Sequence, residues 1–359
     1  MMLFLSKHNP IYNRSMRIKF TFILALALCS SCSIPQVNKN LTVASATALP
    51  VTIMTTATHV QNTQPPATET QETMLTPTLI WADWCVPTTT VPADWSYLDN
   101  GKVRVGVNLY YGASIGLISA GSENIIDTDD NGRYISQSFY GTSPAHRGKW
   151  QNIAWDFNPV QGGASDGTPS RVTEFCNDGT TMYAKTIPQD WGNQGETHTV
   201  MEQWIALRGD IVEIHYRFEY LEEWVNGSTD QETPAIYVRR DLENLVYYSG
   251  DQPWKMEPVT HYQPFRLETN GNDYLSFTES WLAYVNANDW GIGFYKKDEK
   301  NATCFRVGEI GDPSSTSYFA FLDSRSLVPG MVHEYTIYGQ IGSLDKLRAT
   351  FYSLHEQGK

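Results

Sequence analysis

The stretch Val212-Glu213-Ile214-His215-Tyr216-Arg217-Phe218-Glu219-Tyr220 carries the pattern that decides the fold class. Apolar side chains alternate with polar ones, which is typical of a β-strand with one face in a core. Arg208-Gly209-Asp210 separates this stretch from another strand-like run, Val200 to Leu207. Because glycine favours a tight turn, the two runs are predicted to pair as a β-hairpin.

The same alternation recurs along the chain. Further strands are predicted at 102–109, 279–285, 290–296, 316–322 and 333–341. A helix is predicted at the C-terminal end, where Leu344, Leu347, Phe351 and Leu354 follow 3-4-3 spacing behind Ser343 as N-cap. The sequence therefore predicts an all-β fold, a large two-sheet β-sandwich of the supersandwich type with a short C-terminal helix.

The N-terminal region predicts export. Arg17 and Lys19 precede the apolar run Phe20 to Leu28, which is too short to span a bilayer and fits a signal peptide over residues 1–31. Residues 1–15 would be an upstream extension. Cys32 follows two serines, an arrangement that resembles a bacterial lipobox, so Cys32 is the predicted lipidation site. A plain secretory signal is the alternative.

Residues 32–80 are predicted to form a lipid-anchored tether, and residues 81–359 the sandwich domain. The segment 33–80 contains twelve Thr and five Pro without a regular apolar period, so it is expected to be disordered. Membrane contact is then expected through the anchor only, with the domain outside the cytoplasm. Removing residues 1–31 takes away four basic residues and changes the formal net charge from −13 to −17. This charge argues against a nucleic-acid partner; nothing in the sequence indicates an oligomeric state.

Three cysteines remain in the domain: Cys85, Cys176 and Cys304. One pair could form a disulfide outside the cytoplasm, and the sequence leaves the pairing open. No zinc-ligand spacing, phosphate-binding glycine loop or dinucleotide motif is present, so neither a metal nor a cofactor is predicted.

One cluster of acidic residues precedes Arg133. Asp127, Asp129 and Asn131 match the opening of a calcium loop, but Ser138 stands where the loop's glutamate belongs, which favours an ordinary acidic turn. The sharper hypothesis is that Asp130 and Arg133 lie at a sugar-binding rim, where arginine donates paired hydrogen bonds and the aspartate acts as acid or base. A structural Asp–Arg turn pair is the alternative.

Three other segments offer polar groups near aromatic ones. The segment 155–163 is predicted to be a loop, because its proline and paired glycines fit poorly inside a central strand. This loop contains Trp155, Asp156, Asn158 and Gln161. Pro234 restricts Thr233 to extended backbone and so holds Glu232 at a strand entry or loop, followed by Tyr237. Glu279 and Trp281 begin an apolar strand. Each of these residues could instead be a loop anchor or a surface residue.

The segments 130–138, 158–162 and 231–237 resemble stretches, in the same order, of poorly characterised secreted bacterial β-proteins associated with glycan use. In general character these proteins are similar to galactose-mutarotase-like, supersandwich domains. The resemblance covers most of residues 95–350. It implies a carbohydrate function, with an oligo- or polysaccharide as partner, and it identifies no reaction.

The predicted function is that of a membrane-tethered carbohydrate-active enzyme, foremost a glycoside hydrolase. Hydrolysis needs two carboxyl groups, and the predicted pair is Asp130 with Glu232. Asp156 and Glu279 are alternates for this pair.

Substrate binding is assigned to a wider set of residues. Arg133 would orient the substrate, and Trp155 and Trp281 would stack on it. The remaining predicted substrate-binding residues are Asp156, Asn158, Gln161, Tyr237 and Glu279.

Two other functions stay open. A polysaccharide lyase would use Tyr140, Tyr237 or His146 as its base and Arg133 against a uronate, although the negative charge of the protein disfavours an acidic substrate. A surface glycan-binding lipoprotein would use the same aromatic residues without catalysis.

Overall fold

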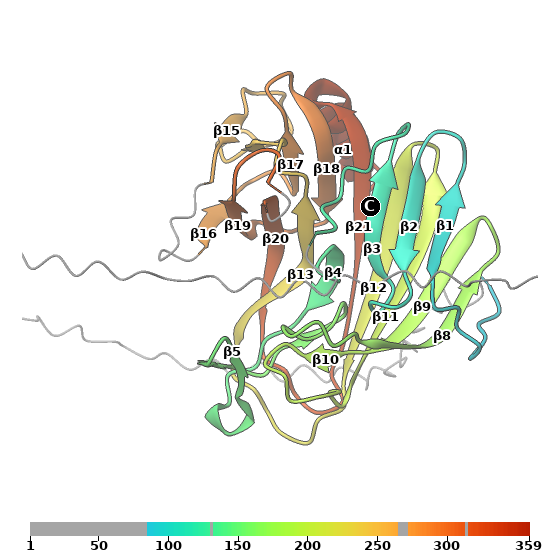
Figure 1. Ribbon diagram of the computed structural model, residues 1–359. Coiled ribbons are helices and arrows are strands. Elements are labelled where there is room, and N and C mark those ends of the chain that lie inside the picture. Colours follow the sequence, from blue (N-terminus) through green and yellow to red (C-terminus); the bar gives the residue numbers. More distant parts are fainter. Residues whose placement is uncertain (1–84, 130–131, 265–271, 313–314) are drawn as a thin grey trace, which may run out of the picture. The chain divides into compact units, whose positions relative to one another are not determined.

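The computed structural model describes residues 85–129, 132–264, 272–312 and 315–359, which form two large antiparallel sheets packed face to face (Figure 1). The predicted all-β sandwich is thereby confirmed. The first sheet has ten described strands: β1 (Trp95–Asp99), β2 (Arg104–Asn108), β3 (Ser114–Ser119), β4 (Ile135–Ser138), β13 (Thr229–Val238), β20 (Thr316–Arg325), β19 (Asn301–Val307) and β16 (Asp273–Ser276) in that order, with β7 (Pro159–Val160) beside β4 and β10 (Gln189–Asp190) beside β7.

The second sheet has nine described strands and lies across the core from the first. In order they are β15 (Thr260–Tyr262), β14 (Asn244–Tyr247), β17 (Trp281–Val285), β18 (Trp290–Lys296), β21 (Val332–Ser343), β12 (Ile211–Tyr220), β11 (Thr199–Arg208), β9 (Thr181–Ile187) and β8 (Arg171–Asn177). Strands β5 (Gly148–Trp150) and β6 (Ile153–Trp155) form a separate hairpin, preceded by the short 3-10 helix η1 (Pro144–His146).

Aromatic rings from the two sheets meet in the core. Phe319 of β20 lies 6.1 Å from Phe294 of β18 and 5.9 Å from Tyr284 of β17, measured between ring centroids. Phe139, just after β4, stacks on Phe218 of β12 at 3.7 Å. All five side chains are almost fully buried, so the hydrophobic effect holds the sheets together over this area.

The predicted hairpin and helix are both present. In the β11–β12 hairpin Arg208 pairs with Ile211, and Gly209 has a φ of +67° in the turn, a value that glycine adopts at little cost. Helix α1 (Leu344–Glu356) begins at Ser343, whose hydroxyl accepts a hydrogen bond from the Lys346 amide. The buried face of α1 packs on β17, β18 and β21 of the nine-stranded sheet.

The domain cysteines resolve the pairing that the sequence left open. Cys85 and Cys176 form a disulfide that links the segment before β1 to β8, and Cys304 is a buried free thiol. Among the described residues no helix is both long and apolar enough to cross a membrane. The predicted signal peptide, Cys32 and the tether lie outside the described residues.

Candidate functional site

The face of the ten-stranded sheet that points away from the core carries a pocket. Phe319 and Phe321 of β20 point into the core, so Tyr318 points to the opposite face because side chains alternate along a strand. The register pairs Tyr318 with Tyr237 of β13. The described lining residues come from several strands and the loops beside them: Arg133, Ser136, Ser138, Tyr140, Trp150, Trp155, Asn158, Val160, Trp191, Glu232, Ala235, Tyr237, Asn272, Phe305 and Tyr318.

The cavity volume of this pocket is about 150 Å³. Pockets that enclose drug-sized ligands have volumes of roughly 300–1,000 Å³. The pocket is therefore suited to one small unit, such as a single ring, with the rest of a larger ligand outside its mouth.

Three tryptophans form one side of the pocket. Trp150 and Trp155 are diagonal neighbours in the β5–β6 hairpin and make an edge-to-face contact, with ring centroids 5.1 Å apart and an interplanar angle of 77°. Trp191, just after β10, lies 6.4 Å from Trp150. The guanidinium of Arg133 lies over the Trp191 ring, 4.5 Å from its centroid. This cation–π contact holds a positive charge at the edge of an aromatic surface.

A second aromatic group comes from neighbouring strands of the sheet. The Tyr318 ring stacks on Phe305 of β19 at 4.4 Å and contacts Tyr237 of β13 at 4.7 Å. Together with the tryptophans these rings supply flat apolar surfaces, which can stack on the apolar face of a ring-shaped ligand.

Glu232 is the one carboxylate among the described residues that line the pocket. Its Oε1 accepts a hydrogen bond of 2.5 Å from the Tyr318 hydroxyl, and the hydroxyls of Tyr140 and Ser138 also contact it. Burial raises the pKa of Glu232, although these hydrogen bonds and the charge of Arg133 act in the opposite direction. Glu232 therefore keeps its proton to a higher pH than an exposed glutamate, as a general acid requires.

The two tyrosines beside Glu232 are hydrogen-bond donors. Burial first, and the charge of Glu232 second, raise the pKa of Tyr140 and of Tyr318 well above the ordinary value. Both phenols consequently stay protonated at neutral pH, which does not favour Tyr140 as the base of a lyase.

A break in the strand register determines the position of Glu232. The pairing of β13 with both β4 and β20 shifts between Glu232 and Ala235, and the Thr233–Pro234 peptide bond within this bulge is cis. Bulges commonly redirect a side chain next to a functional site. The sequence predicted Glu232 at a strand entry or loop, and the structure places it within β13.

Asn158 lines the pocket, but its side chain forms hydrogen bonds with neighbouring residues of the pocket wall. Its Nδ2 donates to Ser138 Oγ at 3.0 Å and to the Phe139 carbonyl at 2.7 Å, while its Oδ1 accepts from Trp155 Nε1 at 3.2 Å. Since both amide hydrogens are used within the protein and Oδ1 accepts from Trp155, Asn158 helps to orient Trp155.

Two predicted binding residues of the 155–163 loop, Asp156 and Gln161, lie outside the pocket lining. Gln161 is buried, and its Nε2 donates to Gln203 Oε1 at 2.9 Å and to the Gly112 carbonyl at 3.1 Å, so it links β11 to the turn before β3 in the interior. Asp156 forms an ion pair with Arg147.

Glu279 and Trp281 also lie away from the pocket, and their predicted role is corrected. Both are fully buried beneath α1, where Glu279 Oε2 accepts from Trp281 Nε1 at 2.8 Å and Oε1 accepts from the Tyr352 hydroxyl at 2.6 Å. A ligand cannot reach groups at zero exposure. The apolar strand covered by a helix explains the placement, because such a strand is buried on both faces.

His146, a predicted lyase base, lines a different pocket. Its ring stacks on Trp224 with centroids 3.6 Å apart. Of the predicted lyase bases, Tyr140 and Tyr237 line the pocket that holds Glu232. Arg133, the predicted partner of a uronate, lies there as well.

Asp130 and Asn131 lie outside the described residues, so the predicted pair of Asp130 with Glu232 stays a prediction. The calcium loop that the sequence analysis weighed and disfavoured includes Asn131 and is likewise untested. Asp127 Oδ1 accepts from the Asp129 amide at 3.0 Å, as in an ordinary acidic turn. In the part of the chain that the structure describes, no group of three or more His, Cys, Asp or Glu could hold a metal ion.

Several pocket residues were not predicted. Trp150 had a local signal, because the dipeptide Gln151-Asn152 fits a two-residue hairpin turn that would place Trp150 near Trp155; both turn residues have positive φ. Trp191 and Phe305 had no such signal. Tyr318 lay in a predicted strand, but whether its side chain lies on the core face or on the pocket face of the sheet depends on which strands pair with that strand.

Comparisons with known proteins give a likeness of fold. No protein-family model and no curated sequence matches the chain. A galactose mutarotase-like protein from Lactobacillus casei aligns with a TM-score of 0.45 at 11% identity, over 69% of this chain and 99% of that one. A galactose mutarotase-related enzyme from Lactobacillus acidophilus gives 0.46 at 6% identity, over 70% and 98%.

A longer enzyme shares the same kind of likeness. The family GH36 α-galactosidase from Geobacillus stearothermophilus aligns with a TM-score of 0.42 at 9% identity, over 70% of this chain and 41% of that protein. The function proposed below is therefore argued from the pocket itself.

Proposed function

We propose that the pocket binds one sugar ring of a glycan and that Glu232 transfers a proton to it. The observation that carries the proposal is the position of Glu232, a carboxyl group with a raised pKa among aromatic rings and hydroxyl donors. Aromatic faces bind the apolar side of a sugar ring, and polar groups at fixed positions bind its hydroxyls.

The reaction that fits best is glycoside hydrolysis. A protonated Glu232 would donate its proton to the leaving oxygen of the glycosidic bond. The second carboxyl group that hydrolysis needs is proposed to be Asp130, three positions before Arg133 in the sequence. The small cavity favours a terminal ring of the glycan, and the formal net charge of −13 favours a neutral glycan over an acidic one.

A polysaccharide lyase is the second candidate, because Arg133 and Tyr140 line the same pocket. Arg133 could pair with the carboxylate of a uronate. The raised pKa of Tyr140 counts against it, since a lyase base must give up its proton. A binding protein without turnover would use the same aromatic rings.

The test is the hydrolysis of a panel of neutral oligosaccharides by the full chain and by two variants. Glu232→Gln removes the acid and keeps the shape of the side chain, while Glu223→Gln makes the same change at an exposed glutamate outside the pocket lining. We expect Glu232→Gln to lower turnover by about 100-fold or more with little change in affinity. Glu223→Gln should leave both unchanged.

Each other outcome points to a different reading of the pocket. Undiminished turnover in Glu232→Gln would refute its role as the acid. Products that absorb in the ultraviolet would indicate a lyase. Binding without turnover by the unchanged protein would indicate a capture protein, and the absence of binding to any glycan would refute the carbohydrate proposal.

The location of the protein is also a proposal. We infer that the domain is exported and tethered to the envelope through Cys32, as the N-terminal sequence predicts. The disulfide between Cys85 and Cys176 supports a location outside the cytoplasm, because disulfides persist in oxidising compartments. Metabolic labelling with a radioactive fatty acid, with Cys32→Ser as the unlabelled control, tests the anchor.

A further inference from the structure

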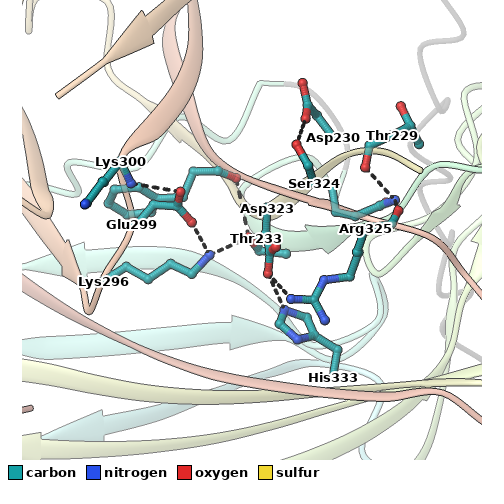
Figure 2. Close-up of polar contacts among 12 residues, drawn as sticks. Thr229, Asp230, Thr233, Lys296, Glu299, Lys300, Asp323, Ser324, Arg325 and His333 are labelled. Atoms are coloured by element: carbon teal, nitrogen blue, oxygen red, sulfur yellow. Dashed lines mark hydrogen bonds and ion pairs between the residues drawn. The ribbon is translucent and has the colours of Figure 1, made fainter. Parts of the chain in front are cut away.

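A network of polar contacts joins Lys296, Glu299 and Thr233 and includes Asp323, Arg325 and His333 (Figure 2). Lys296, the last residue of β18 in the nine-stranded sheet, donates through Nζ to Thr233 Oγ1 at 2.7 Å. Thr233 belongs to β13 of the ten-stranded sheet. The same Nζ also donates to Glu299 Oε2 at 2.7 Å. One lysine side chain therefore ties the two sheets together.

This tie is costly for a protein interior. Lys296 is 6% exposed and Glu299 is 9% exposed, while Thr233 is fully buried. Burial lowers the pKa of Lys296 against the opposing influence of Glu299. A buried ion pair is often no more stable than apolar side chains of the same volume. Stability alone therefore gives little reason for a lysine here, and a specific geometric role is a better explanation.

The charges around Lys296 are balanced. Figure 2 shows Asp323 beside Arg325 and His333; the His333 Nε2 lies 3.3 Å from Asp323 Oδ2, and Arg325 pairs with the same carboxylate. Burial, and then the charge of Arg325, lower the pKa of His333 to about 3, so this histidine is neutral at physiological pH. Each basic side chain of this network thus has a carboxylate partner, Glu299 for Lys296 and Asp323 for Arg325.

The anchored residue, Thr233, directly follows Glu232 in the β13 bulge. Glu232 lines the pocket, whereas the Thr233 hydroxyl meets Lys296 of the other sheet in the interior. Glu232 pairs with Leu322 of β20 and Ser138 of β4, but the register breaks immediately after it, and Thr233 has no ladder partner on either strand. Backbone pairing therefore does not hold the bulge next to Glu232, and a side-chain contact to Thr233 can.

We propose that Lys296 is a positioning residue: its hydrogen bond to Thr233, braced by Glu299, fixes the bulge and thereby the direction of Glu232 in the pocket. The inference rests on the proposed function in that Glu232 acts on a ligand. Glu299 is itself held, because its Oε1 accepts from the backbone amides of Lys300 and Asn301 at 3.0 and 3.3 Å. The tie is therefore rigid from one sheet to the other.

The test uses three variants of the full chain. Thr233→Val removes the accepting hydroxyl without changing a charge, and Lys296→Met removes the donor. Lys300→Met is the matched control, because Lys300 lies exposed on the same turn. The main measurement is the pH titration of the Glu232 carboxyl carbon by NMR with carbon-13-labelled glutamate, the signal being assigned by its loss in Glu232→Gln.

We expect Thr233→Val to move the Glu232 titration toward that of an exposed glutamate by about half a pH unit or more. The double variant with Lys296→Met should move it no further than the larger single effect, since both act through one hydrogen bond. If a glycan is turned over, kcat should fall by about 100-fold with a smaller change in KM. Lys300→Met should match the unchanged protein.

A purely structural role predicts a different result. Variants that unfold at lower urea concentration while Glu232 titrates as in the unchanged protein would overturn the proposal. Should Lys296→Met fail to fold, Thr233→Val alone decides, because it keeps the ion pair of Lys296 with Glu299. A shifted titration in a protein that turns over no glycan would support the positioning role and refute the proposed function, so the two failures are distinguishable.

Discussion

Glu279→Gln is predicted to destabilise the fold without affecting the pocket. The carboxylate of Glu279 accepts from the Trp254 amide at 2.8 Å, from Trp281 Nε1 at 2.8 Å and from the Tyr352 hydroxyl at 2.6 Å. The Arg348 guanidinium lies 3.6 Å from the same group. A single buried carboxylate thus joins the 250–257 loop, β17 and α1.

The magnitude follows from what glutamine cannot replace. The carbonyl oxygen of the glutamine can accept from the donors that now contact Oε1. Its amide nitrogen would then lie against the indole N–H of Trp281, and because both groups are donors no hydrogen bond could form between them. An unsatisfied buried donor costs about 1–3 kcal/mol, and breaking a buried ion pair such as that with Arg348 costs about 3–5 kcal/mol. Since the two contributions overlap, we expect the free energy of unfolding to fall by about 3–5 kcal/mol.

Urea denaturation with linear extrapolation measures this change. Glu257→Gln, at an exposed position in the same loop, is the matched control and should change stability by less than about 0.5 kcal/mol. Glycan binding by folded Glu279→Gln should equal that of the unchanged protein. A loss below about 1 kcal/mol, or a selective loss of binding, would refute the reasoning that Glu279 anchors the helix.

Two further predictions concern stability. Burial lowers the pKa of His215 from 6.5 to about 4. Because the unfolded chain then binds the proton more readily than the folded one, the free energy of unfolding should fall as pH drops from about 6.5 to about 4, by at most about 1.4 kcal/mol per pH unit for this group. In urea denaturation, His215→Gln should show a shallower dependence of this free energy on pH. Identical slopes would contradict this. Replacing both Cys85 and Cys176 with serine opens a loop of 91 residues in sequence separation and should lower the free energy of unfolding by about 2–5 kcal/mol. Reducing the disulfide in the unchanged protein is the control and should give the same loss.

Local periodicity was sufficient to predict several of the strands and the terminal helix. The alternation in 212–220 gave β12, and the 3-4-3 spacing from Leu344 to Leu354 gave α1, with Ser343 as its N-cap. These features depend on residues a few positions apart, whose backbone geometry the chain itself imposes. The fold class followed because many such strands need two sheets to bury their apolar faces.

The composition of the pocket was partly predictable. Arg133, Trp155, Glu232 and Tyr237 were predicted from polar and aromatic residues at turns, and they line one pocket together. Glu279 was predicted on the same grounds and is buried under α1 instead. The local sequence around a glutamate before an apolar strand is the same whether a helix or solvent covers that glutamate, so the pattern cannot distinguish the two cases.

What the sequence by itself determined, then, is the strand pattern, the terminal helix and a set of residues with suitable chemistry. The tertiary structure alone decided that β4 and β20 flank β13, which brings Ser138 and Tyr318 to Glu232. It also decided that Lys296 reaches Thr233 through the core and that Cys85 pairs with Cys176. The physical reason is that these contacts join residues some 60 to 95 positions apart, and only the packing of whole sheets determines such distances.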